Sequence, residues 1–111
     1  MDKNFLSKRI RTIALYRGKM ILSKRDRAYY YAYMRKLRYN LMYTHSPNKS
    51  HELAYLCKTI FRFKDIEKRR ISNTFFTKPK KMIDLAVHDA LDVLNSMMRW
   101  EGVDTNEYPL A

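Results

Sequence analysis

Apolar residues at helical spacing are the feature that most limits what this chain can fold into. They recur every three or four positions in four segments, which predicts helices over residues 4–22, 27–43, 51–71 and 79–101. The steadiest stripe lies in the last segment and consists of Ile83, Val87, Ala90, Leu94 and Met97, widened by Leu91 and Met98. Because only two glycines and three prolines occur in 111 residues, the chain has few turns. We therefore predict an all-α fold.

Turn-forming residues separate these segments. Asp26 stands where an N-cap residue would open the second helix, and Pro79 suits the first turn of the fourth. The length suits one modest hydrophobic core. We predict two parts: a three-helix unit over residues 1–76, then an amphipathic acidic helix with a short tail over residues 77–111.

The charge is unevenly distributed along the chain. Residues 1–81 hold 22 Lys or Arg against 5 Asp or Glu, whereas residues 82–111 hold 1 against 6. A body this basic favours an anionic partner, such as an acidic protein, an anionic lipid or a nucleic acid. Asp84, Asp89 and Asp92 are placed outside the apolar stripe of the fourth helix.

Two residues of the first helix call for an explanation. Arg17 falls in the same row as Ile13 and Met20, and a charged group inside an apolar stripe is costly unless it is paired. Gly18 lowers the stability of a helix interior by about 1 kcal/mol relative to alanine. We expect a partner for Arg17 and the close approach of another backbone at Gly18.

Two stretches suggest a family. The tripeptide Leu15-Tyr16-Arg17 lies on the first helix, and residues 30–38 of the second helix hold tyrosines followed by an arginine-rich turn. With the small size and the basic charge, this pattern resembles the LYR-motif family of small mitochondrial adaptor proteins. The likeness covers residues 8–70. Where the family has a phenylalanine after the basic cluster, this chain has Leu41.

The resemblance implies an antiparallel three-helix bundle that binds the mitochondrial acyl carrier protein, whose acyl-4'-phosphopantetheine enters the space between the helices. The residues expected to contact the carrier and its prosthetic group are Leu15, Tyr16, Arg17, Arg35, Lys36 and Arg38. The residues expected to line a seam for the acyl chain are Ile13, Met20, Met34, Leu37, Leu41, Leu56 and Ile60. An anionic phosphodiester would also compensate the charge of Arg17.

The same resemblance implies a host complex and a compartment. Family members serve respiratory complex I, the mitochondrial ribosome, and iron–sulfur cluster biogenesis beside the cysteine desulfurase. The long fourth helix favours stable incorporation, and we expect an accessory subunit of complex I, on the matrix side of the inner membrane or in the matrix. The alternatives are a ribosome-associated adaptor and an iron–sulfur factor. RNA contact through Lys78, Lys80, Lys81 and residues 68–70 is a weaker expectation.

No catalytic signature appears. Two glycines cannot build a phosphate-binding loop, and no nucleophile elbow or paired carboxylates occur. Asp84, His88 and Asp92 share a helix face but lack further metal ligands, so no metal site is predicted. The single Cys57 is expected to be an inert core residue. No apolar run approaches the roughly 20 residues that span a bilayer.

Overall fold

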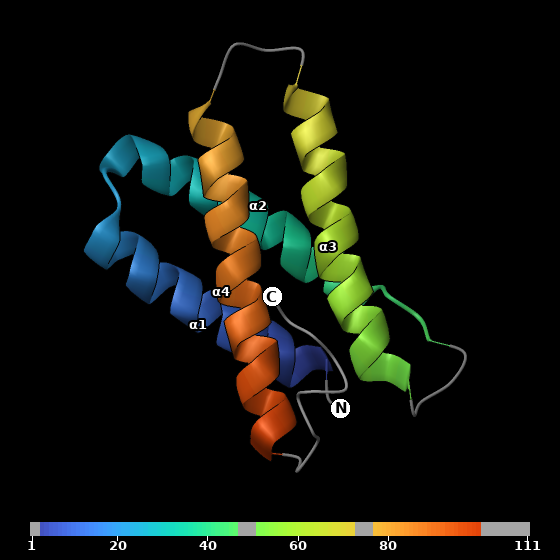
Figure 1. Cartoon of the computed structure of the whole chain (residues 1–111). Helices are drawn as coiled ribbons and strands as arrows, with labels where there is room; N and C mark the ends of the chain where they lie inside the picture. Colours follow the sequence, from blue (N-terminus) through green and yellow to red (C-terminus); the bar gives the residue numbers. More distant parts are fainter. Residues whose placement is uncertain (1–2, 47–50, 73–76, 101–111) are drawn as a thin grey trace.

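The computed structural model describes residues 3–46, 51–72 and 77–100. Every regular element in these ranges is a helix, and none of these helices is long and apolar enough to cross a membrane. The helices are α1 (Lys3–Ile21), α2 (Lys24–Met42), α3 (Glu52–Ile71) and α4 (Lys78–Trp100) (Figure 1). The predicted all-α bundle is confirmed. The predicted boundary between the two parts, after residue 76, lies outside the described residues.

The start of α2 differs from the prediction. The N-cap is Ser23, whose hydroxyl accepts a hydrogen bond from the Asp26 backbone N–H at 3.3 Å. Asp26 lies instead in the first turn, where its negative charge suits the positive end of the helix dipole. The helix therefore begins three residues earlier than expected, and the link from α1 to α2 is short.

The four helices form two antiparallel pairs. α1 and α2 run in opposite directions, and so do α3 and α4 (Figure 1). α4 packs against each of the other three helices, whereas α1 and α3 do not pack against each other. α2 likewise packs against the other three helices, so α2 and α4 together join the bundle.

α4 supplies a large share of the hydrophobic core. All residues of its predicted stripe are buried, and they form one cluster with the buried residues of α1, α2 and α3. The placement of Asp89 outside this stripe was wrong, because Asp89 is only 1% exposed. The aspartate belongs to the core and needs partners there.

In α3, one pair of neighbouring residues departs from the pattern of apolar residues inside and charged residues outside. Leu56, Cys57, Ile60 and Phe63 are buried, but Ile66 is exposed and its neighbour Glu67 is buried. The Glu67 carboxylate is paired with Lys36 at 3.4 Å and with Arg70 at 3.2 Å, which compensates its burial. Burial raises the pKa of the Cys57 thiol to about 11, as an inert core cysteine requires.

The buried face of α1 is rotated relative to the prediction. Its buried residues are Leu6, Ile10, Ala14 and Gly18, while Met20 is exposed. The predicted close neighbour of Gly18 was a backbone, but the structure places the ring of Tyr31 there. A Cβ atom at position 18 would lie 2.6 Å from Tyr31 Cε1. Small residues therefore let α1 approach a ring on α2.

Gly18→Ala is expected to change the free energy of unfolding with opposite signs in two backgrounds. In the wild-type chain the added methyl displaces the Tyr31 ring, and such overpacking outweighs the gain in helix propensity, with a net loss of about 1 kcal/mol. In a Tyr31→Ala background the clash is absent, so the same substitution should stabilise by about 1 kcal/mol. Urea denaturation of the four proteins measures this coupling. Equal effects in both backgrounds would contradict the contact.

Candidate anion-binding groove

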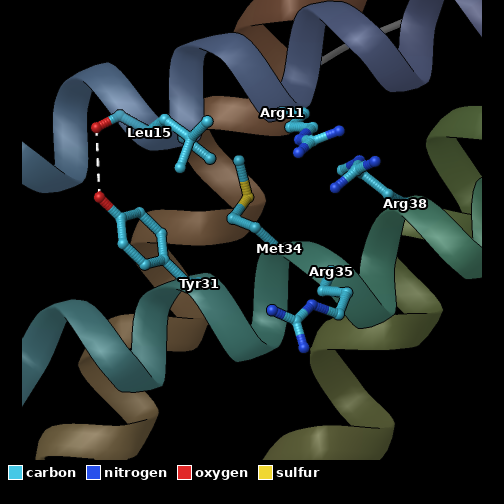
Figure 2. A pocket seen from close by; sticks show the side chains of 7 residues that line it. Arg11, Leu15, Tyr31, Met34, Arg35 and Arg38 are labelled. Atoms are coloured by element: carbon cyan, nitrogen blue, oxygen red, sulfur yellow. Dashed lines mark hydrogen bonds between the residues drawn. The ribbon is translucent and has the colours of Figure 1, made fainter.

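A groove of about 370 Å³ lies between α1 and α2 on the outside of the bundle (Figure 2). The residues that line it are Arg11, Ala14, Leu15, Tyr31, Met34, Arg35 and Arg38. Arg11 and Leu15 are one turn apart on α1, and on α2 both Met34 and Arg35 lie one turn after Tyr31, with Arg38 one turn further on. Each helix therefore turns one row of side chains toward the groove.

Three arginines line this groove: Arg11 and Arg38 lie close to each other between the helices, and Arg35 lies apart from them on the α2 side (Figure 2). Burial lowers the pKa of Arg38, and the nearby charges of Arg11 and Arg35 lower it further. Arg38 Nε donates a hydrogen bond to Ser7 Oγ at 3.3 Å, which brings no negative charge. Within the described ranges, no acidic side chain forms a salt bridge with any of the three. A bound anion would relieve this repulsion.

Another part of the groove is apolar. Leu15 reaches into it from α1, and Met34 forms its floor from α2 (Figure 2). The Tyr31 hydroxyl donates a hydrogen bond to the Leu15 carbonyl oxygen at 3.2 Å and so ties the two helices together. The groove thus combines three cations with hydrocarbon, which suits a ligand that is anionic at one end and apolar at the other.

Arg17 does not line the groove. Its Nε lies 2.9 Å from Asp89 Oδ1, and the Asp89 side chain is fully buried whereas that of Arg17 is 40% exposed. Tyr30 donates a hydrogen bond to Asp89 Oδ2 at 2.6 Å. The pKa of the Tyr30 phenol is raised, chiefly because the phenol is buried and secondly because of this hydrogen bond. The charge of Arg17 is therefore compensated inside the bundle, and no external phosphodiester is needed for it.

The side chains of the tripeptide Leu15-Tyr16-Arg17 point in three different directions. Leu15 lines the groove, Tyr16 is 67% exposed, and Arg17 reaches the buried carboxylate of α4. Among the other predicted contact residues, Arg35 and Arg38 both line the groove. Lys36 lies away from the groove, beside Glu67.

The sequence analysis did not predict that Arg11 lines the groove. Its position one turn before Leu15 on the same helix could have indicated this.

Most residues of the predicted acyl-chain seam lie inside the packed core. The fully or almost fully buried ones are Met34, Leu37, Leu41, Leu56 and Ile60. Ile13 is partly buried against this core, and Met20 is exposed. These side chains and those of α4 belong to one cluster, so a hydrocarbon chain could enter the seam only if part of that cluster moved.

The described residues place one group of possible metal ligands close together, namely His88, Asp89 and Asp92. Both oxygens of Asp89 already face Arg17 and Tyr30, so the group is poorly suited to a cation. Asp84 is held instead by Lys64 at 3.3 Å and Lys68 at 2.8 Å. Burial alone would raise the pKa of Asp84, but hydrogen bonds from these lysines lower it.

The geometry defines a small helical bundle with a cationic and apolar groove on one face. No protein-family model, no curated protein and no solved structure matches the chain. The function must therefore be argued from the residues themselves.

Proposed function

We propose that this chain is a non-catalytic adaptor that binds an acyl carrier protein through the groove between α1 and α2. The observation that carries the proposal is that Arg11, Arg35 and Arg38 line the same groove as Leu15 and Met34. Acyl carrier proteins present acidic helices and a phosphodiester-linked, hydrocarbon-bearing prosthetic group. The groove offers charge for the first and apolar surface for the second.

Two exposed apolar side chains on α1 add to the docking surface. Tyr16 and Met20 lie one turn apart on one face of the helix, and each is 67% exposed. Surface clusters of this kind are common at protein–protein interfaces, where a rim of charged groups surrounds apolar contacts. Arg35 and Arg38 would form the charged side of such an interface, and Tyr16 and Met20 the apolar side.

The acyl chain can be accommodated in two ways. Hydrocarbon can lie in the groove beside Leu15 and Met34 while the core stays intact. Insertion into the predicted seam requires α4 to move, since that helix covers the seam. The first arrangement costs less, because it leaves the pairing of Arg17 with Asp89 unbroken.

The resemblance to the LYR-motif family extends the proposal to a host. The adaptor would hold the carrier on a large mitochondrial assembly, with respiratory complex I as the expected host. A ribosome-associated adaptor and an iron–sulfur biogenesis factor are the alternatives. Native gel migration of the tagged chain, followed by mass spectrometry of the band, distinguishes these hosts.

Reversing two charges of the groove tests carrier binding. Arg35→Glu with Arg38→Glu is expected to weaken binding of acylated carrier protein by about 100-fold or more, because it replaces attraction by repulsion. Calorimetry measures the affinity, and intact-mass analysis of the complex detects the phosphopantetheine group. Arg17→Ala is unsuitable, because it also strips the buried Asp89 of its partner.

The matched control is Lys24→Glu with Arg25→Glu, which makes the same charge change at exposed positions of α2 outside the groove. This control should keep nearly the full affinity. If both double variants weaken binding equally, net charge alone attracts the carrier and the groove is not its site. Failure of the wild-type chain to bind the carrier at all would exclude the proposed function.

A further inference from the structure

A second surface, lined mainly by residues outside the arginine groove, runs along the outer side of α2 and α3. Three adjoining hollows of about 410 to 540 Å³ each lie there. The first two share Asn40, and the first and third share Arg62 and Ile66, so the three hollows adjoin along one surface. We call this surface the tyrosine trough, formed chiefly by Tyr39, Tyr43, Tyr55, Arg62, Ile66 and Arg70.

Exposed aromatic rings mark this trough. Tyr39 and Tyr43 lie one turn apart on α2 and are 64% and 65% exposed. Their ring centroids are 4.6 Å apart, so they form a paired aromatic surface. Tyr55 adds a third partly exposed ring from α3. Exposed tyrosines are common at interfaces, and open rings of this kind are surfaces on which unpaired bases can stack.

The charges of the trough are mostly positive. The cations that line it are Arg35, Lys36, Lys58, Arg62, Arg69 and Arg70, against the acids Asp65 and Glu67. Glu67 is itself buried and already paired with Lys36 and Arg70. The cations come from both helices and follow the length of the trough. A partner with charge spread along a chain fits this distribution.

We infer that the tyrosine trough binds single-stranded nucleic acid. Unpaired bases would stack on Tyr39, Tyr43 and Tyr55, and the phosphates would lie beside the flanking arginines. An anionic membrane would require a broader apolar face, and an acidic amphipathic helix would require a continuous apolar stripe. Rings interspersed with cations meet neither requirement. This inference goes beyond carrier binding and, apart from Arg35, which borders both surfaces, uses residues that the carrier surface does not need.

The test is fluorescence anisotropy of the full chain with a labelled 12-nucleotide oligouridine. Tyr39→Ala with Tyr43→Ala is expected to weaken binding by at least about tenfold, because two stacking surfaces are lost. Tyr39→Phe with Tyr43→Phe keeps the rings and should keep the affinity. Tyr16→Ala removes an equally exposed ring on α1 and is the matched control; it should have no effect.

Two further measurements make the result specific. Arg62→Gln with Arg69→Gln should reduce the slope of log affinity against log salt by about 1.4, the value for two lost single-strand phosphate contacts. Duplex of the same length should bind more weakly, because its bases cannot stack on the rings.

Equal binding of duplex and single strand, unchanged by the tyrosine substitutions, would overturn the inference and leave only general attraction of polyanions. Capture of an acidic protein at the trough in place of nucleic acid would also overturn it. Carrier binding by the Tyr39→Ala, Tyr43→Ala variant should be normal. The two proposals can therefore fail separately.

Discussion

Replacing Asp89 with alanine is expected to destabilise the folded chain by about 3 kcal/mol, the lower part of the range for breaking a buried ion pair. The substitution leaves the fully buried Tyr30 hydroxyl without its acceptor and removes the partner of Arg17. The loss stays in the lower part of that range because the Arg17 side chain is 40% exposed and can be rehydrated. The free energy of unfolding in urea, followed by circular dichroism, measures the effect.

Asp92→Ala is the matched control for this substitution. Asp92 lies one turn from Asp89 on α4, but its side chain is 62% exposed, so its removal should change stability by no more than about 0.5 kcal/mol. The triple variant Arg17→Met, Tyr30→Phe, Asp89→Leu should regain most of the lost stability, since it removes every polar member of the network together. Equal effects at positions 89 and 92 would contradict the buried network.

The chain truncated after residue 76 is expected to lose cooperative unfolding altogether. α4 packs against every other helix and supplies much of the shared core. Without it, the apolar faces of α1, α2 and α3 are exposed to water and Asp89 is absent. Near-ultraviolet circular dichroism and binding of a hydrophobic dye distinguish the expected loosely packed state from a folded one.

Supplying residues 77–111 as a separate peptide is the matching positive control, and it should restore part of the native signal. A cooperatively folded fragment of residues 1–76 would show instead that α4 is an addition to an independent three-helix unit. The outcome also bears on the proposed function. If α4 is indispensable, displacing it to admit an acyl chain is costly, and hydrocarbon is better placed in the groove beside Leu15.

Much of the site could be foreseen from the sequence. The arginine-rich turn of the second helix pointed to Arg35 and Arg38, which do share the groove. The lone charge of Arg17 in an apolar row called for a partner, and the structure provides one. Arg11 was not foreseen, because a single helix does not show which of its many cations will face a neighbour.

The sequence by itself determined the four helices and the apolar stripe of α4, because helical periodicity is a local property of the chain. Only the tertiary structure decided that Asp89 is the partner of Arg17, because 72 positions separate the two residues. The apolar stripe of α4 did not reveal that Asp89 is buried beside it. The tertiary structure also decided which face of α1 is buried. Ala14 and Gly18 are buried there because small side chains let α2 approach, and close approach depends on the shape of both helices.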